Sequence, residues 1–486
     1  MSRRLLLCLL LLPLAMPGMA DEADSGKPPN ILLIIGDDMG SETLSCYGWS
    51  EHTAKTPTLD DLCLSGVRFD NFWSQASCSP TRATMMTGRY AVRTGVGRPT
   101  GDNGAMGYFP RPLPKPAAAP AEPERRAGRR GPPGTPENAP DSYGLQLNEF
   151  TLPMAFKVNN DLGYSTAAIG KWHLSDRRNG WERHPNIVGF DHFAGLIRGF
   201  PDSFFTWNKA VDGEWSQQTG YLPDDKTDDA IEWLAAQGEQ PWFLWMAYNL
   251  PHTPAHIPPE HLWRSDWSHL DPEVVPERGN RDYFHAMLEA LDAEIERLLD
   301  SIPPDVRNNT YVIFAGDNGT AGGYVTPPVA QGHGKGSMYQ GGVNVPMFVT
   351  GPGVATGVSK ALVNSTDMFL TILELAGIDA SDTVPENAQL DSISFAPYLS
   401  KPSMQSRRQF SYADAFRGNF AGIAGASYAV RNERFKLVRA SDEFEFYDLS
   451  ADPFENVNLL DGELDEIQQT QYESLRTIAS DIRSGR

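Results

Sequence analysis

Cysteine is scarce in this chain, with only four among 486 residues. So few cysteines exclude a small scaffold held together by many disulfides. Cys8 lies inside an N-terminal apolar run, which argues against a lipid anchor at that position. The remaining three are an odd number, so at least one has no partner within the chain. Cys46 and Cys63 either form a bridge or stay as inert thiols, and Cys78 needs another explanation.

Long apolar runs are absent after the first twenty residues. Residues 1–20 have the pattern of a secretory signal peptide: Arg3 and Arg4 come first, an apolar run follows, and small residues end at Ala20. No later run reaches the roughly 18 apolar residues that a membrane span needs. We therefore expect an exported protein, periplasmic or secreted, that has no membrane contact once the signal is cut.

Basic residues are also in deficit, with 41 Lys and Arg against 62 Asp and Glu and a formal net charge of -21. The signal contains two arginines and no acids, so its removal makes the balance more negative still. Such a surface repels nucleic acid and anionic membranes, which excludes both as partners. An anionic substrate would need a local group of cations set against this overall field.

Four short apolar runs each end in polar residues that can do chemistry. Bounded by glycine or proline and separated by helical stretches, they read as buried strands of a mainly parallel sheet. Ligands of such sheets bind beyond the carboxyl ends of the strands. The runs are 30–35, 165–169, 242–248 and 311–315, followed by Asp37 and Asp38, by Lys171 and His173, by Asn249 and His252, and by Asp317 and Asn318.

The rest of the chain completes an α/β fold with a large, mainly parallel sheet flanked by helices. Apolar residues at three- and four-residue spacing predict helices over 282–300 and 365–376. We expect a catalytic domain over 28–404, interrupted by a disordered insertion at 110–140 that is rich in proline and arginine. From 405 to 486, short β-like segments at 434–439 and 444–449 and a charged terminal helix predict a smaller C-terminal α+β subdomain.

Two of the strand ends offer only oxygen ligands, namely Asp37 and Asp38 on one and Asp317 and Asn318 on the other. Hard oxygen donors without thiolate or imidazole suit Ca²⁺ or Mg²⁺ better than zinc, and we favour calcium. His252 and His256 have the four-residue spacing of helical zinc ligands, but the prolines around them forbid a regular helix. A zinc site of that kind is therefore excluded.

Cys78 lies at the start of an expected helix, because Pro80 is tolerated in a first turn and no helix breaker follows up to Thr87. A helix start has free N–H groups and a positive field, so it is a natural place for a sulfate or phosphate. The stretch CSPTRATMMTGR resembles the signature of the type I sulfatases of the alkaline-phosphatase superfamily. The resemblance continues through PNILLIIGDDMG, GYSTAAIGKWHL, NLPHTPAH, FAGDNG, GHGKGSMYQGGVNVP and YDLSADPFENVNL.

This resemblance implies a chemistry for the matching residues. Cys78 would be oxidised to formylglycine by a transiently bound maturation enzyme, and the hydrated aldehyde would attack sulfur. One Ca²⁺ per chain would be held by Asp37, Asp38, Asp317, Asn318 and residue 78. Three cations would neutralise the sulfuryl oxygens: Arg82, Lys171 and Lys335. His252, helped by Lys335, would protonate the leaving alcohol, and His173 would remove the proton that lets sulfate depart. Lys171, His252 and Lys335 would also bind the substrate.

The resemblance has one local departure and leaves alternatives open. Family members often have Glu and Arg where this chain has Gln340 and Asn344, which puts only that loop and its substrate contacts in question. The expected substrate is a sulfated carbohydrate or an aryl sulfate. A phosphoesterase or phosphonate monoester hydrolase of the same superfamily is one alternative, although such enzymes normally have Ser or Thr at the nucleophile position. An inactive, calcium-dependent glycan-binding protein is another, although it should have lost Lys171, His173 or Lys335.

Overall fold

The computed structural model describes residues 27–100, 143–274, 276–277, 279–416, 423–440 and 442–485. The expected signal peptide at 1–20 and the insertion at 110–140 lie outside these residues. Within the described parts of the chain, no helix is both long enough and apolar enough to cross a membrane.

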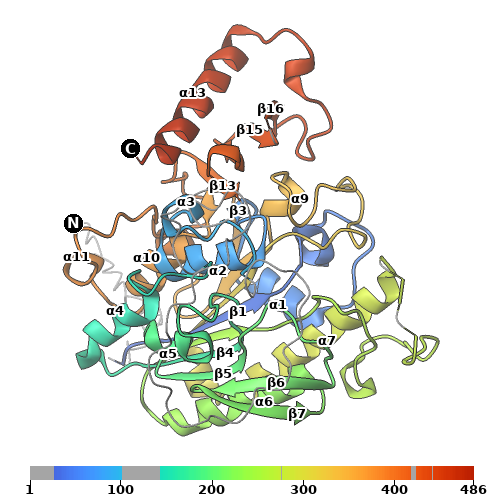
Figure 1. Cartoon of the computed structure of the whole chain (residues 1–486), viewed down its shortest axis with the longest axis vertical. Helices are drawn as coiled ribbons and strands as arrows, with labels where there is room; N and C mark the ends of the chain where they lie inside the picture. Colours follow the sequence, from blue (N-terminus) through green and yellow to red (C-terminus); the bar gives the residue numbers. More distant parts are fainter. Residues whose placement is uncertain are drawn as a thin grey trace, which may run out of the picture.

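A ten-stranded sheet forms the centre of the molecule (Figure 1). Five neighbouring strands, from β9 to β5, are parallel, while β10, β6 and β7 run antiparallel to their neighbours on the inner side. In spatial order the strands are β11 (Gly357–Ser359), β2 (Val67–Phe69), β10 (Met347–Thr350), β9 (Thr310–Gly316), β1 (Asn30–Gly36), β8 (Trp242–Ala247), β4 (Ser165–Lys171), β5 (His192–Leu196), β6 (Thr206–Val211) and β7 (Glu214–Thr219).

The four strands expected from the sequence are β1, β4, β8 and β9, and they are direct neighbours in the order β9-β1-β8-β4. Their residues are apolar without alternation because helices cover both faces of the sheet. Along β1, Ile31 and Leu33 enter the core on one face, while Leu32 and Ile34 enter the core on the other. The prediction of a mainly parallel sheet flanked by helices is confirmed.

The described residues form helices of very different length, most of which flank the large sheet. They are α1 (Pro57–Ser65), α2 (Cys78–Thr87), α3 (Ala91–Thr94), α4 (Leu152–Val158), α5 (His184–Ile187), α6 (Leu222–Gln237), α7 (Arg281–Asp300), α8 (Pro304–Asn308), α9 (Gln340–Val343), α10 (Asp367–Leu375), α11 (Ala380–Thr383), α12 (Ala396–Ser400) and α13 (Glu466–Arg483). The predicted helices at 282–300 and 365–376 correspond to α7 and α10. Their apolar stripes pack on opposite faces of the sheet, with Met287 of α7 in one core and Phe369 of α10 in the other.

A smaller antiparallel sheet and α13 form the C-terminal part of the fold, at the top of Figure 1. Its strands are β13 (Ser411–Ala415), β14 (Ser427–Arg431), β15 (Phe435–Ala440) and β16 (Glu443–Asp448). One face packs on α13, where Leu475 meets Leu437, and the other face covers Trp73 and Ala76. Trp73 belongs to a two-stranded sheet of β3 (Phe72–Trp73) and β12 (Val363–Asn364). The small sheet therefore supports the segment that leads into α2.

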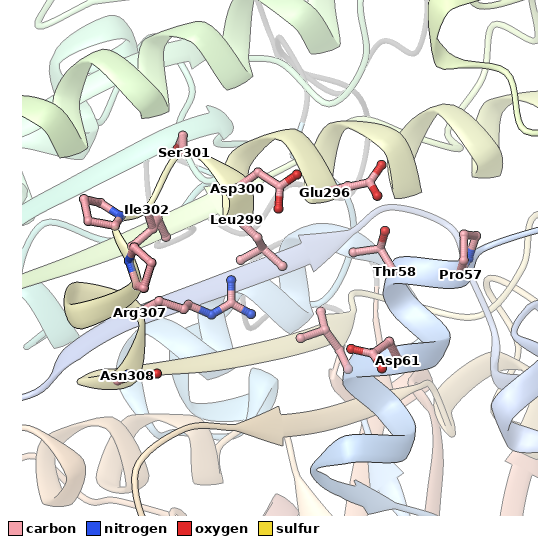
Figure 2. Close-up of a pocket in the computed structure, with 13 residues that line it drawn as sticks. Pro57, Thr58, Asp61, Glu296, Leu299, Asp300, Ser301, Ile302, Arg307 and Asn308 are labelled. Carbon is pink, nitrogen blue, oxygen red and sulfur yellow. The ribbon is translucent and has the colours of Figure 1, made fainter.

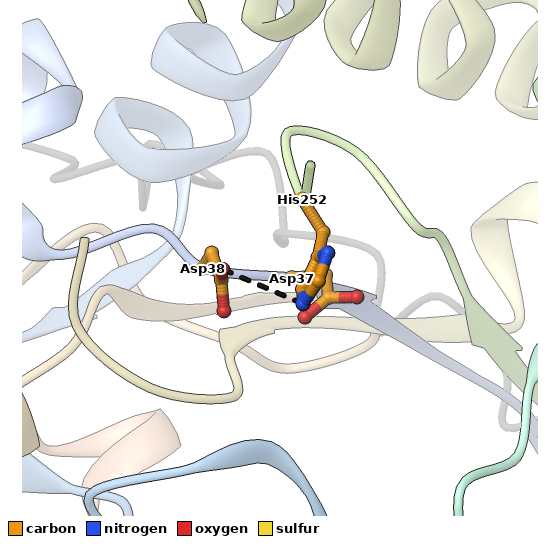
Figure 3. Close-up of side chains that lie close together, drawn as sticks. All are labelled: Asp37, Asp38 and His252. Atoms are coloured by element: carbon orange, nitrogen blue, oxygen red, sulfur yellow. Dashed lines mark ion pairs between the residues drawn. The ribbon is translucent and has the colours of Figure 1, made fainter. Parts of the chain in front are cut away.

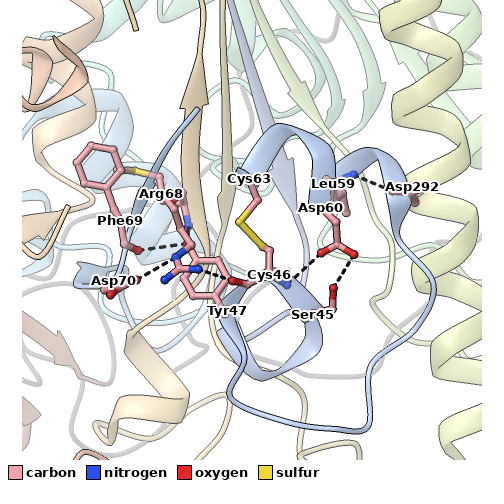
Figure 4. Close-up of a disulfide and its surroundings, with 11 residues drawn as sticks. Ser45, Cys46, Tyr47, Leu59, Asp60, Cys63, Arg68, Phe69, Asp70 and Asp292 are labelled. Carbon is pink, nitrogen blue, oxygen red and sulfur yellow. Dashed lines mark hydrogen bonds and ion pairs between the residues drawn. A yellow bond between two sulfur atoms is a disulfide. The ribbon is translucent and has the colours of Figure 1, made fainter. Parts of the chain in front are cut away.

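A disulfide joins Cys46 to Cys63 of α1, with the two Cα atoms 6.4 Å apart (Figure 4). This separation lies within the range that a bridge allows, so the pairing alternative is the correct one. Among the described residues, the bridge leaves Cys78 as the free cysteine, and its side chain is buried.

Candidate functional site

Four polar side chains follow β1 and β9, and all four are buried: Asp37, Asp38, Asp317 and Asn318. The two strands end together, because Gly36 pairs with Gly316 in parallel register. The Asp38 backbone N–H donates to Asp317 Oδ1 at 3.2 Å, and Asn318 Nδ2 donates to Asp38 Oδ1 at 2.9 Å. The structure thus brings the four predicted oxygen ligands into one cluster.

Three cations from distant parts of the chain pair with these carboxylates. Lys171, the last residue of β4, places Nζ 2.7 Å from Asp37 Oδ2. Arg82 of α2 donates to Asp317 Oδ2 from Nε at 3.2 Å and from Nη2 at 2.9 Å. Lys335 forms an ion pair with Asp38. Because the Arg82 and Lys171 pairs are wholly buried, their charges act with little screening by water.

The charges in this cluster shift one another's pKa values. Burial, reinforced by the neighbouring Asp317 carboxylate, raises the pKa of Asp37 well above its ordinary value, and Lys171 offsets this only in part. Burial alone would lower the pKa of Lys335, but the Asp38 carboxylate outweighs it and raises that pKa. A carboxylate that is buried beside other carboxylates is stabilised in its charged form by further positive charge.

The cluster fits a divalent cation. Ligand atoms of Asp37, Asp38 and His252 lie within 4.8 Å of one another, and Figure 3 shows the three side chains grouped together, with the Asp38–His252 ion pair as a dashed line. Two buried oxygens of the cluster, Asp37 Oδ1 and Asn318 Oδ1, have no hydrogen-bond partner among the described residues, which is costly unless something else binds them. The sequence interpretation did not include His252 among the ligands, yet its Nε2 lies 3.7 Å from Asp38 Oδ2.

Cys78 is the first residue of α2, as expected, and its thiol faces a histidine. Cys78 Sγ lies 3.1 Å from His173 Nδ1, and His173 Nε2 lies 2.9 Å from the carbonyl oxygen of Thr100. Because a carbonyl oxygen can only accept, Nε2 carries the ring hydrogen and Nδ1 keeps a lone pair toward residue 78. Burial, with the charge of Lys171, lowers the pKa of His173 and keeps its imidazole neutral.

Two residues of the site have left-handed backbone conformations that side chains rarely adopt. The φ angle is 71° at Asp38 and 59° at His173, and each residue lies two residues beyond the end of a parallel strand. Such conformations cluster at functional sites because surrounding structure must hold them in place. Here they turn the two side chains back toward α2 and the carboxylates.

The sequence interpretation missed Lys226 of α6. This lysine is buried, its Nζ hydrogen-bonds to Asn249 Oδ1, and burial lowers its pKa despite the nearby Asp37 carboxylate. A lone lysine within a charged helix gives no signal in a sequence. Asn249 did give one, because it follows β8 at the same edge of the sheet.

Gln340 and Asn344, the two departures from the family pattern, bind different partners. Trp73 Nε1 donates to Gln340 Oε1 at 3.1 Å, and Asn344 Nδ2 donates to the carbonyl oxygen of Asp70 at 3.0 Å. Both residues therefore serve the packing of β3 near the C-terminal sheet.

One cavity of about 670 Å³ lies away from this cluster (Figure 2). It is lined by the end of α7, by α1 and by α8, and Asn308 in its wall precedes the start of β9. The cavity is thus at the amino ends of the strands, opposite the edge where the polar residues gather. Open α/β sheets place their ligand sites at the carboxyl ends, so the polar cluster is the candidate active site.

Fold and site together define a class of protein. A free cysteine at a helix N-terminus, cations beside it and a buried oxygen cluster suit a hydrolase that acts on an anionic ester. The chain belongs to the sulfatase family: the model described as Sulfatase matches residues 29–378. A second model, described as N-sulphoglucosamine sulphohydrolase, C-terminal, matches residues 332–481. The protein is therefore a sulfuric ester hydrolase of the alkaline-phosphatase superfamily.

Curated relatives agree along most of the chain. Human arylsulfatase A is 29% identical over 487 aligned residues, which cover 90% of this chain and 84% of the relative. Human N-acetylgalactosamine-6-sulfatase is also 29% identical, and its alignment covers 79% of this chain and 68% of the relative. These relatives support the hydrolysis of sulfate esters on glycans or aryl substrates.

Solved structures share the fold. The structure of Ps i-CgsB in complex with k-i-k-neocarrahexaose has a TM-score of 0.72 and 23% identity, covering 94% of this chain and 93% of the other. A protein solved with its substrate D-glucosamine-2-N,6-O-disulfate has a TM-score of 0.66 and 20% identity, covering 94% of this chain and 99% of the other.

Proposed function

We propose that the protein hydrolyses sulfate monoesters of carbohydrates with a formylglycine made from Cys78 and with a bound calcium ion. One observation supports this most strongly: Cys78 begins α2 with its side chain 3.1 Å from the Nδ1 atom of His173, next to the cations Arg82 and Lys171. A structural cysteine packed among apolar groups would have no use for these neighbours. A maturation enzyme that recognises the unfolded signature would supply the aldehyde.

The cations of the chain hold the sulfuryl group. Arg82 is fixed by two partners, since its Nη1 donates to the carbonyl oxygen of Lys171 at 2.7 Å while its other nitrogens bind Asp317. Lys171 and Lys335 are tethered to Asp37 and Asp38. Preorganised positive charge in a site that excludes water stabilises the charge that develops on sulfuryl oxygens.

Two histidines handle the protons at opposite ends of the reaction. His173 keeps its Nδ1 lone pair toward residue 78 because Thr100 binds the hydrogen on Nε2, so it suits the base that releases sulfate from residue 78. His252 Nδ1 donates a hydrogen bond to the carbonyl oxygen of Thr253 at 2.7 Å. Its Nε2 faces the carboxylates, and once this nitrogen is also protonated, it would pass that proton to the leaving alcohol with the help of Lys335.

Asp37, Asp38, Asp317 and Asn318 would hold the calcium ion, and residue 78 would complete the ligand set. The unpartnered oxygens of Asp37 and Asn318 support this assignment, as does the all-oxygen chemistry of the four side chains. When bound, the ion lowers the pKa of a coordinated hydroxyl and so makes it a nucleophile near neutral pH.

The substrate and location rest on the relatives and on the disulfide. The names of the similar proteins include sulfatases of amino sugars, which favours a sulfated sugar over a simple aryl sulfate as the natural substrate. The bridge between Cys46 and Cys63 suits an oxidising compartment. Together with the signal pattern in residues 1–20, it supports export to the periplasm or the medium.

Mass spectrometry of the tryptic peptide Phe69–Arg82 tests the proposal. Protein produced together with a formylglycine-generating enzyme should show an aldehyde at position 78 and should release inorganic sulfate from 4-nitrophenyl sulfate. Cys78→Ala, treated in the same way, should show neither. Active wild-type protein that carries only the unmodified thiol would contradict the mechanism, and phosphate release that exceeds sulfate release from matched esters would favour the phosphoesterase alternative.

A further inference from the structure

The loop that joins β5 to β6 carries three phenylalanines, Phe200, Phe204 and Phe205, and two of them are strongly exposed. Phe200 is 49% exposed and Phe205 is 43% exposed, while Phe204 is buried. Single exposed apolar side chains are common and need no explanation by themselves. Phe200 differs from the other two because of the residue that it contacts.

Phe200 stacks on the catalytic candidate His252. The two rings are nearly parallel, with an interplanar angle of 10° and centroids 5.6 Å apart. The His252 ring is fixed in its own plane, since Nδ1 binds the carbonyl oxygen of Thr253 and Nε2 points toward Asp38. At this centroid distance the two parallel rings are offset, so the imidazole lies against only part of Phe200, and the residue stays 49% exposed.

The loop does not need Phe200 for its attachment. Phe204 stacks on His256 with centroids 4.1 Å apart, and Tyr221 Oη lies 3.0 Å from His256 Nε2. At the start of the loop, the His173 backbone N–H donates to the carbonyl oxygen of Ile197 at 3.1 Å. These contacts hold both ends of the loop against the site, so an exposed phenyl ring between them is left for another purpose.

We propose that Phe200 forms the wall of a binding subsite for the leaving alcohol, and that this subsite takes an alcohol whose ring has an apolar face. The inference rests on the proposed function, in which the oxygen of the leaving alcohol lies at His252 Nε2. The carbon skeleton attached to that oxygen must then extend past the edge of the imidazole, where the parallel ring of Phe200 lies. Pockets for small molecules combine such aromatic walls with few polar groups that fix orientation.

The chemistry of this wall selects among sulfate esters. A pyranose presents a face of C–H groups and an aryl sulfate presents a flat ring, and both can lie against a phenyl group. A short acyclic alcohol cannot reach the wall and would bind through the sulfuryl group alone. Phe200 is therefore a specificity-determining residue, whereas Arg82, Lys171 and Lys335 bind the part that all sulfate esters share.

Phe200→Ala and Phe200→Leu in the mature enzyme test the inference, with Phe205→Ala as the matched control. Phe205 is similarly exposed and lies in the same loop, but it packs on Tyr221 and His256. The measurements are kcat and KM for 4-nitrophenyl sulfate and inhibition constants for pyranose monosulfates, methyl sulfate and inorganic sulfate. Phe200→Ala should weaken binding of the ring compounds roughly tenfold, the scale of one lost aromatic contact, and should raise KM for 4-nitrophenyl sulfate more than it lowers kcat. Methyl sulfate and inorganic sulfate should not show this tenfold loss.

The variants also separate a binding wall from a support for His252. If Phe200 only held His252 in place, Phe200→Ala would lower kcat and shift its pH profile for every ester, with no preference for rings. That result, or an equal loss in Phe205→Ala, would overturn the inference. Phe200→Leu should keep the wild-type pH profile and lose part of the ring preference, and the ring compound that loses most affinity identifies an aryl or a pyranose subsite. A wild-type enzyme that releases no sulfate from any ester would instead refute the proposed function.

Discussion

His173 shows at the residue scale how a single contact decides a chemical role. Its ring lies between the Cys78 thiol and the carbonyl oxygen of Thr100, so only one nitrogen is left to accept a proton. That nitrogen faces residue 78 and not the carboxylate cluster. The geometry therefore separates His173 from His252, which faces Asp38.

His173→Ala should stall the enzyme after the first chemical step. In the mature variant, 4-nitrophenyl sulfate should release a burst of about one leaving group per active site, and further release should be much slower. The reason is that the covalent intermediate accumulates when its breakdown is blocked. Rapid-mixing absorbance measurements check this. His252→Ala is the comparison and should show no burst, with the greatest loss for esters of poor leaving groups. Uniformly slow release from His173→Ala would mean that the roles are assigned to the wrong histidines.

Glu42 is a second residue whose surroundings predict a measurable effect. Its side chain is buried, and burial raises its pKa from 4.5 to about 7, although the nearby Thr320 hydroxyl opposes this shift in part. The folded state thus binds a proton more tightly than the unfolded state. This contribution to stability is complete below pH 4.5 and is lost as the pH rises through 7.

Glu42→Gln should remove this pH dependence. The free energy of unfolding of the variant, relative to wild type, should increase by about 1 to 3 kcal/mol between pH 5 and pH 8, given roughly 1.4 kcal/mol for each pKa unit. Urea unfolding at the two pH values measures the difference. The exposed Glu51→Gln is the control and should show no such increase. A constant difference at both pH values would show that Glu42 is already charged in the folded protein.

At the scale of an element, the loop from β5 to β6 acts on both histidines at once. Gly199 lies so close to His173 that a Cβ atom there would be 2.4 Å from Cε1 of the ring, and its neighbour Phe200 stacks on His252. Glycine is required here for close approach, not for an unusual φ angle. The loop thus links the position of His173, the proposed base, to the wall of the proposed subsite.

Gly199→Ala should displace the His173 ring and lower kcat by at least an order of magnitude, since small misplacements of catalytic groups are costly. The melting temperature should change little, because the nearest atoms to the added Cβ all belong to one side chain, that of His173. Gly425→Ala is the control, as an added Cβ there meets no atom within 4 Å. Steady-state kinetics and thermal unfolding check both variants. Wild-type kcat in Gly199→Ala would show that the ring has room to move.

At the scale of the whole molecule, the site depends on parts that are far apart in the chain. Asp37 and Asp38 follow β1, Arg82 comes from α2, Lys171 from β4 and Asp317 from β9. The C-terminal sheet also contributes, because Gln75 Oε1, three residues before Cys78, accepts from the Asp414 backbone N–H at 3.0 Å. An ion bound by these carboxylates should therefore stabilise the fold as a whole, because its ligands come from distant parts of the chain.

Removal of calcium should lower both activity and stability. An ion that binds only the folded state stabilises it by about 2.7 kcal/mol at a hundredfold excess over Kd, so EDTA-treated protein should regain a few degrees of melting temperature when Ca²⁺ is added. Thermal unfolding with and without Ca²⁺ measures this. Asp37→Asn should lose the shift, whereas the exposed Asp305→Asn in α8 should keep it. An equal shift in both variants would place the ion elsewhere.

Much of the fold followed from local pattern. The four apolar runs correspond to β1, β4, β8 and β9, and the spaced apolar residues correspond to α7 and α10. A strand buried on both faces needs a continuous apolar run, and a helix buried on one side needs apolar residues at three- and four-residue spacing, so both patterns can be read from the sequence. The C-terminal segments predicted at 434–439 and 444–449 became β15 and β16 with a shift of one residue. The edge strand β7 was not predicted, since it is largely exposed and has no apolar run.

The sequence by itself determined which residue types lie at the strand ends and at the start of α2, because side-chain chemistry and the spacing of apolar residues are local properties of the chain. Only the tertiary structure decided which of them meet: that Lys171 pairs with Asp37 and Arg82 with Asp317, that Lys226 is buried nearby, and that Phe200 lies on His252. Such pairings depend on the order and register of the strands, which long-range packing fixes and no stretch of sequence specifies.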